Sequence, residues 1–181
     1  MLHTIIAYVE DKPGVLNRVA SLFRRRAFNI ESLAVGQTHL PGVSRMTIMV
    51  EADEEGTARR IEANLYKLVN VLRVENLTHK ESVERELALI KVKADSARRT
   101  EIVQIADIFN ANILDAAPNI LVLEITGNLE KVNRLLRMLE PFSIMEVQRT
   151  GVVAMLRGSD EVASNLPMVT GGKNGQPPAG D

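Results

Sequence analysis

Near its start the chain reads Thr4-Ile5-Ile6-Ala7-Tyr8-Val9-Glu10-Asp11-Lys12-Pro13-Gly14-Val15-Leu16. The segment Thr4–Glu10 is β-branched and apolar, which is typical of a buried strand. Pro13-Gly14 then breaks the chain, and from Val15 the apolar residues recur at the spacing of one helical face. This stretch therefore predicts a strand, a tight turn and a helix that ends near three arginines, Arg24-Arg25-Arg26.

The first half continues with three more strands and a second helix. The turn signal His39-Leu40-Pro41-Gly42 separates two of these strands. The predicted elements are strands over Asn29–Val35, Arg45–Glu51 and Val69–Leu77, and a helix over Glu54–Leu68. The order of elements is β-α-β-β-α-β.

The second half repeats this order. Its predicted elements are strands over Glu86–Val92, Asn112–Ala116, Ile120–Thr126 and Ser143–Arg149, with helices over Arg98–Asn110 and Leu129–Leu139. A β-α-β-β-α-β unit folds as a four-stranded antiparallel sheet backed by two helices. We therefore expect an α+β fold with two ferredoxin-like sandwiches in tandem.

The pattern predicts two domains, over residues 1–78 and 85–158, joined by a hydrophilic linker over residues 79–84. Residues 159–181 are rich in Gly and Pro and offer little apolar area to bury, so we expect a disordered tail there. About 80 residues is a small core for an independent unit, so pairing with another subunit is expected.

Composition excludes several classes of function. Lys and Arg total 22 against 23 for Asp and Glu in 181 residues, a net charge of −1 that provides no basic field for nucleic acid or anionic lipid. The absence of cysteine removes thiolate metal sites and fits a reducing cytoplasm. The sequence shows no secretory signal and no apolar run long enough to span a membrane, so we expect a soluble cytoplasmic protein.

The turn Asp11–Gly14 has the chemistry to hold a free amino acid. The first amides of a helix lack internal partners and suit a carboxylate, while the Asp11 carboxylate suits an ammonium group. Gly14 lets a ligand approach the backbone. A plainer explanation, which the spacing alone favours, is that Pro13-Gly14 starts a helix and Asp11 is a loop or capping acid. Asn29 is likewise explained by a turn or by contact with a ligand or partner.

Catalytic and metal-binding motifs are not visible. The sequence has no Gly-x-Ser-x-Gly elbow, no P-loop and no Gly-x-Gly-x-x-Gly, and its three histidines lack metal-ligand spacing. Tandem ferredoxin-like units also bind RNA, through aromatic residues on their first and third strands. Here the first strand offers only Tyr8 and the third has none, which disfavours that alternative.

Several segments together resemble the ACT domain and the second domain of the acetolactate synthase small (regulatory) subunit. The most particular are Phe28-Asn29-Ile30-Glu31-Ser32-Leu33 and Arg149-Thr150-Gly151-Val152-Val153. The resemblance covers about residues 1–158 and also includes Glu10–Leu16, Leu40–Ile48, Lys67–Val74 and Val83–Leu87.

The resemblance implies a non-catalytic subunit in the biosynthesis of valine, leucine and isoleucine. Such a subunit dimerises through its ACT domains, binds and activates the catalytic large subunit, and confers feedback inhibition by L-valine or sometimes by leucine or isoleucine. It also implies that thiamine diphosphate, Mg²⁺ and FAD are bound by the large subunit and no cofactor by this chain. A free-standing ACT sensor that controls a different enzyme is the alternative.

The resemblance further implies an effector site shared by two chains. Carried onto this sequence, one side consists of Asp11, Pro13, Gly14, Val15 and Leu16, and the other of Asn29 and Ile30. Some members of the family carry Asn in place of Asp11. The equivalent loop of the second domain, Asp95-Ser96-Ala97-Arg98, lacks Pro-Gly, so we expect that domain to serve dimerisation or coupling rather than effector binding.

Overall fold

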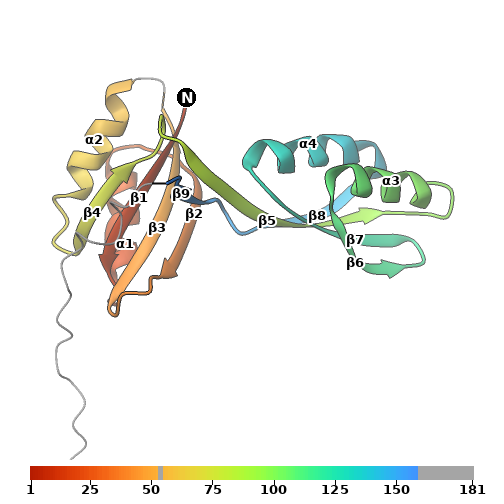
Figure 1. Ribbon diagram of the computed structural model, residues 1–181, viewed down its shortest axis with the longest axis horizontal. Coiled ribbons are helices and arrows are strands. Elements are labelled where there is room, and N and C mark those ends of the chain that lie inside the picture. Colours follow the sequence, from red (N-terminus) through yellow and green to blue (C-terminus); the bar gives the residue numbers. More distant parts are fainter. Residues whose placement is uncertain (53–54, 159–181) are drawn as a thin grey trace, which may run out of the picture. The chain divides into compact units, whose positions relative to one another are not determined.

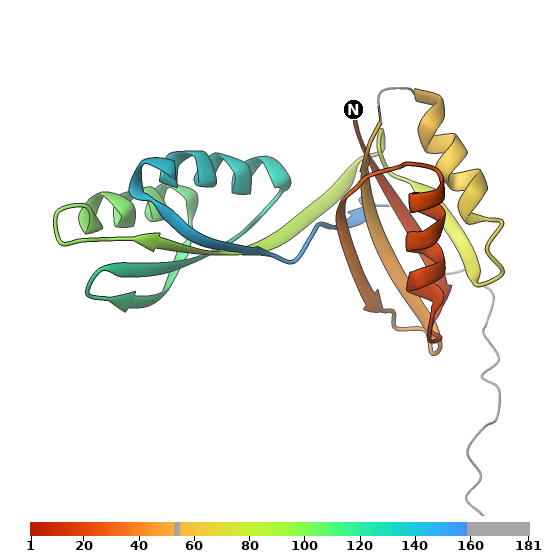
Figure 2. The same ribbon diagram turned by 180° about the vertical axis from the view of Figure 1, so that it is seen from behind.

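The computed structural model describes residues 1–52 and 55–158, which fall into two compact units. The first unit contains Met1–Glu31 and Val35–His79, and the second contains Ser32–Ala34 and Lys80–Arg157. Each unit has two helices on one face of an antiparallel sheet (Figures 1 and 2). The predicted tail over residues 159–181 lies outside the described residues.

The first unit follows the predicted β-α-β-β-α-β order. Its elements are β1 (Leu2–Glu10), α1 (Val15–Arg25), β2 (Ile30–Gln37), β3 (Val43–Glu51), α2 (Glu55–Leu65) and β4 (Val71–Asn76). The strands lie in the order β2-β3-β1-β4, and β1 pairs antiparallel with both β3 and β4. The strand β2 therefore occupies an edge of this sheet.

The helix α1 packs on the sheet through the face that its apolar spacing predicts. Its buried residues are Val15, Val19, Leu22 and Phe23. The Phe23 ring meets Phe28 edge to face, with 6.4 Å between ring centroids, a favourable geometry for two aromatic rings. Because Phe28 lies just after α1, this contact fixes where the chain leaves the helix to enter β2.

The helix α2 is shorter than predicted, since it ends at Leu65 rather than Leu68. Beyond it the amide of Lys67 donates to the carbonyl of Asn64, and the amide of Leu68 donates to that of Leu65. Each of these hydrogen bonds joins residues three positions apart, so the last turn is tighter than an α-helical turn, as is common where a helix ends. The chain then reaches β4 at Val71.

The second unit repeats the order and adds a strand. Its elements are β5 (Ser82–Lys93), α3 (Arg99–Phe109), β6 (Asn112–Ala117), β7 (Ile120–Gly127), α4 (Leu129–Leu139), a 3₁₀ turn (Glu140–Phe142), β8 (Ile144–Arg149) and β9 (Val153–Leu156). The sheet order is β6-β7-β5-β8, and β9 pairs with β5. Ala88, Ile90 and Val92 point from β5 into a core closed by α3 and α4.

Two features of the second unit differ from the prediction. The strand β5 begins at Ser82, inside the predicted linker, and β9 was not predicted. Both follow from one pairing, in which Val83 lies opposite Met155 and Arg85 opposite Val153. A four-residue strand carries too little periodicity to be recognised from sequence. The α+β class and the two β-α-β-β-α-β units are otherwise as predicted.

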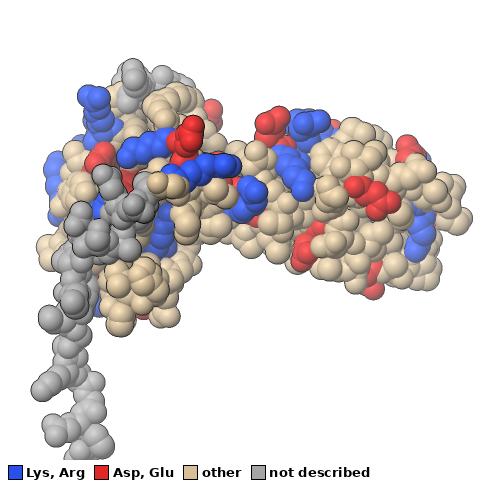
Figure 3. All heavy atoms as spheres, viewed as in Figure 1, with Lys and Arg blue, Asp and Glu red and all other residues tan. Residues whose placement is uncertain are grey.

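No helix in the described part of the chain is long and apolar enough to cross a membrane. Acidic and basic side chains are interspersed on the face shown in Figure 3, with no continuous basic surface there. This distribution agrees with the balanced composition.

Candidate functional site

The turn between β1 and α1 has an unusual backbone at Gly14. Its φ of 82° lies in the left-handed region, which side chains disfavour, although a Cβ there would meet no heavy atom within 4 Å. Gly14 is therefore required by the shape of the turn and not by lack of space. The open space beside it leaves the start of α1 accessible to a ligand.

Two amides at the start of α1 lack an acceptor within the described residues. The amide of Val15 donates to the carbonyl of Lys12, and the amide of Arg18 donates to that of Gly14. Neither a backbone carbonyl nor a capping side chain accepts from Leu16 or Asn17 in the same part of the structure. Open amides at a helix start are suited to a carboxylate group.

Asp11 is exposed and is held at both its backbone and its side chain. Its amide donates to the carbonyl of Gly42 over 2.8 Å. Its Oδ2 accepts a 2.8 Å hydrogen bond from Nε2 of Gln37, the last residue of β2. The second oxygen of the Asp11 carboxylate accepts no hydrogen bond from the described residues, so it can pair with an ammonium group.

A polar network supports the turn from the other side. Asn70 donates from its side chain to Glu10, and its Oδ1 accepts a 2.8 Å hydrogen bond from Arg18. Lys12 forms an ion pair with Glu10 at 3.1 Å. The hydrogen bond from Asn70, followed by that from Lys12, lowers the pKa of Glu10 from its ordinary value. Sequence reasoning did not find Gln37 or Asn70, because their roles depend on contacts between distant segments.

Asn29 and Ile30 lie at the opposite end of α1 from Gly14. The helix has 11 residues, so the two ends are separated by roughly 16 Å at 1.5 Å per residue. Asn29 is exposed and its side chain donates to Glu31. One chain therefore brings together Asp11, Pro13, Gly14, Val15 and Leu16, and leaves Asn29 and Ile30 apart from them.

The outer edge of β2 is unpaired within the described residues, because only β3 pairs with it there. Val35 on this strand is 46% exposed and Gly36 and Gln37 are also exposed. An open strand edge with exposed apolar groups is a template for pairing with another chain. The edge begins next to Asn29 and ends at Gln37, which contacts Asp11.

The equivalent turn of the second unit is held by more side-chain hydrogen bonds. There the Asp95 side chain accepts a 3.0 Å hydrogen bond from the amide of Arg98, and its carbonyl accepts from the amide of Arg99. The Arg99 side chain donates to the carbonyls of Ala117 and Pro118 in the β6–β7 turn. The second turn is therefore braced by its own side chains. The amides of Thr100 and Glu101 at the start of α3 nevertheless lack an acceptor within the described residues, as those of Leu16 and Asn17 do in α1.

Other chemistries find little support in the described residues. No group of three or more His, Asp or Glu side chains in this part of the chain is placed to hold a metal ion. Tyr8, the aromatic residue of β1, is only 4% exposed, and the Arg45 guanidinium lies 5.7 Å from its ring centroid. A ring covered in this way offers no face for stacking an RNA base.

Comparison with known proteins agrees with this geometry. Residues 5–73 match the family model "AHAS small subunit-like ACT domain", and residues 85–158 match the model "Small subunit of acetolactate synthase". The chain is 50% identical over 156 residues to the acetolactate synthase small subunit of Mycobacterium bovis, covering 86% of this chain and 92% of that protein.

Two further relatives come from other organisms. A probable acetolactate synthase small subunit of Archaeoglobus fulgidus is 47% identical over 88% of this chain and 99% of its own length. The crystal structure of the acetolactate synthase small subunit from Thermotoga maritima superposes with a TM-score of 0.80 at 42% identity, covering 88% of this chain and 99% of that one. The chain, whose matches extend through both units, therefore belongs to the family of acetolactate synthase small subunits.

Proposed function

We propose that this chain is the non-catalytic regulatory subunit of acetolactate synthase, which binds and activates the catalytic large subunit and makes it sensitive to valine. Membership of the small-subunit family supports a larger partner. The open turn at Asp11–Gly14 is the observation that carries the sensing role. Thiamine diphosphate, Mg²⁺ and FAD are assigned to the partner, and the cytoplasm is the compartment in which both subunits work.

The edge strand β2 explains why the effector site requires a dimer. In a two-fold dimer that pairs β2 antiparallel with its copy, the start of one strand lies beside the end of the other. Asn29 and Ile30 of the second copy then lie beside Gln37, and hence beside Asp11. The two half-sites, separated along α1 in one chain, meet across this interface.

A free branched-chain amino acid fits the groups that would line this site. Its carboxylate accepts from the amides of Leu16 and Asn17, and its ammonium group pairs with Asp11. Leu16, which is 44% exposed, and Ile30 of the second copy provide apolar contact for a branched side chain. Asn29 contributes an amide that hydrogen-bonds to either polar group of the ligand.

Reconstitution tests the proposal. The large subunit is assayed for acetolactate formation alone, with this chain, and with this chain plus L-valine. We expect stimulation by the chain and inhibition on adding valine. The Gly14→Asp variant, which places a carboxylate where the ligand's carboxylate binds, should stimulate normally but lose inhibition. Absence of stimulation by the unmodified chain would contradict the proposed partner.

The same assay distinguishes the proposed regulatory subunit from the alternative, a free-standing sensor that controls a different enzyme. Such a sensor would bind valine in calorimetry yet leave acetolactate formation unchanged. Calorimetry on the Asn29→Lys variant completes the design, because the added charge lies in the other half of the site. If valine binding survives unchanged in both Gly14→Asp and Asn29→Lys, the assignment of the site is wrong.

A further inference from the structure

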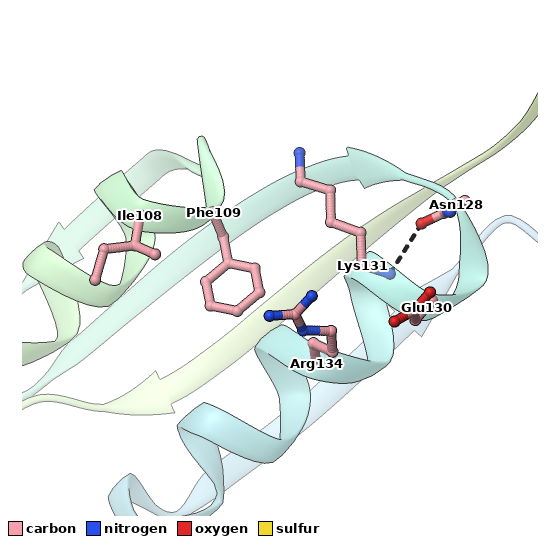
Figure 4. Close-up of a pocket in the computed structure, with 6 residues that line it drawn as sticks. All are labelled: Ile108, Phe109, Asn128, Glu130, Lys131 and Arg134. Atoms are coloured by element: carbon pink, nitrogen blue, oxygen red, sulfur yellow. Dashed lines mark hydrogen bonds between the residues drawn. The ribbon is translucent and has the colours of Figure 1, made fainter.

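The second unit has a surface pocket far in sequence from the effector turn. It lies where the end of α3 meets the start of α4, and its volume is about 340 Å³ (Figure 4). This volume is near the lower limit of pockets that bind small molecules, roughly 300–1,000 Å³. The lining residues are Ile108, Phe109, Asn128, Glu130, Lys131 and Arg134.

One wall of this pocket is apolar. Phe109 packs on the core of the second unit, so its ring is held in place, whereas Ile108 is 74% exposed. Burial of such an exposed aliphatic side chain under a ligand is favourable, because apolar surface is removed from water. The wall thus favours a ligand with a small apolar tail.

The opposite wall carries Arg134, a cation without a partner in the described part of the chain. Arg134 extends toward the Phe109 ring and forms no hydrogen bond or ion pair within the described residues (Figure 4). Arg149 of the same unit, by contrast, binds both Glu86 and Asn133. Lys131 is partly occupied, since its Nζ donates to the carbonyl of Thr126 over 3.2 Å. A guanidinium group beside an apolar wall suits a carboxylate that bears an apolar tail.

The recognition of a carboxylate by Arg134 does not rely on the backbone amides at the start of α4. The side chain of Asn128 already accepts a 2.9 Å hydrogen bond from the amide of Lys131 and so caps the helix. Glu130 also lines the pocket, and its carboxylate disfavours a second negative charge but accepts an ammonium group. The charged side chains of the pocket therefore match one carboxylate, with or without an adjacent ammonium group.

From these contacts we infer that the second unit has its own binding site for a small carboxylate with a branched apolar tail. Arg134 binds the carboxylate, and Ile108 and Phe109 contact the tail. Both a 2-oxo acid and an apolar amino acid have this chemistry. Only the amino acid has an ammonium group, which Glu130 accepts. The site is complete within one chain and does not depend on the shared effector site of the first unit.

Methyl NMR spectra of the full chain, labelled at the isoleucine δ1 carbons, test this site. The probes are 3-methyl-2-oxobutanoate, L-valine and isobutylamine, which carry a branched tail with different charged groups. We expect millimolar concentrations of the two carboxylates to shift the Ile108 methyl signal. Isobutylamine, which lacks the carboxylate that Arg134 binds, should shift it much less at the same concentration. The Ile30 signal reports separately on the effector site of the first unit, so failure at one site is distinguishable from failure at the other.

Variants identify the contacts. Arg134→Gln should weaken the Ile108 response about tenfold, the size expected for one charge-assisted hydrogen bond. Arg137→Gln, on the same helix but outside the pocket, should leave it unchanged. Glu130→Gln removes a negative charge from the pocket, so it should strengthen binding of the oxo acid. If the amino acid is the better ligand, the same variant should also weaken binding of valine. An Ile108 signal that no carboxylate moves, or whose shift survives Arg134→Gln unchanged, would overturn the inference.

Discussion

Gln37 holds Asp11 through a 2.8 Å hydrogen bond from its Nε2 to the Oδ2 of the carboxylate. This contact joins the last residue of β2, the edge strand, to the first residue of the turn proposed to bind the effector. In the proposed dimer the same strand edge forms the interface. The orientation of Asp11 therefore depends on the strand that the second copy would cover.

Replacement of Gln37 should impair effector binding. In the Gln37→Glu variant a second carboxylate faces Asp11, and repulsion between like charges moves Asp11 away from the position in which it binds the ligand's ammonium group. We expect valine affinity to fall about tenfold, measured by calorimetry. Gln104→Glu on the exposed side of α3 introduces the same charge elsewhere and should leave the affinity unchanged. Equal affinities in both variants would show that Gln37 does not position Asp11.

The conformation of Gly14 predicts a loss of stability in the Gly14→Ala variant. Because φ is 82° and no neighbour blocks a Cβ, the cost is backbone strain of about 1–2 kcal/mol in the free energy of unfolding. Gly36→Ala is the control, since its Cβ also meets nothing and its φ lies outside the left-handed region. Urea unfolding measures both, and a Gly36→Ala variant that loses as much stability would refute the explanation by strain.

Two ion pairs include a residue of β5, and breaking the pair between Arg149 and Glu86 should destabilise the protein more than breaking the other. The Glu86 side chain is only 2% exposed, so Arg149→Ala leaves a buried carboxylate without its cation and should cost about 3 kcal/mol of unfolding free energy. Lys91→Ala removes the cation from Glu146, a pair that is exposed on both sides and screened by water, so it should cost clearly less than Arg149→Ala. Similar losses in the two variants would contradict this assignment.

Acid titration should reveal the network around Glu10. Its pKa is lowered in the folded state, mainly by the Asn70 hydrogen bond, so its contribution to stability is present above the ordinary pKa and lost as pH falls through the lowered one. Asn70→Ala should raise the pKa of Glu10 and make the loss of stability on acidification smaller. The carboxyl carbon signal of Glu10, followed against pH by NMR, measures the shift.

The same titration contains its own control. Glu146 also has a lowered pKa, caused by the hydrogen bond from Lys91 in the second unit. Asn70→Ala should leave the Glu146 curve where it is. Movement of both curves would indicate a general change in the protein instead of the loss of one hydrogen bond.

The elements with strong local signals were predictable from sequence. The apolar spacing of α1, the Pro13-Gly14 break and the repeated order of elements gave both units, because helix and strand periodicity are local properties. The strand β9 and the start of β5 were missed, since their pairing joins residues that are some seventy positions apart. The turn at Asp11–Gly14 was predicted as an effector site from its residue types and the family resemblance, and this stays a prediction. The contacts of Gln37 and Asn70 with it are long-range hydrogen bonds that local sequence patterns do not reveal.

In the proposed dimer, the unpaired edge of β2 would make amino acid sensing depend on the concentration of the chain. If the complete site exists only where two such edges meet, each bound effector must strengthen the dimer by the same factor by which dimerisation strengthens effector binding. The apparent affinity for the effector then rises with the concentration of the chain itself. A cell that produces little of this subunit would be insensitive to the amino acid even with every residue of the site intact.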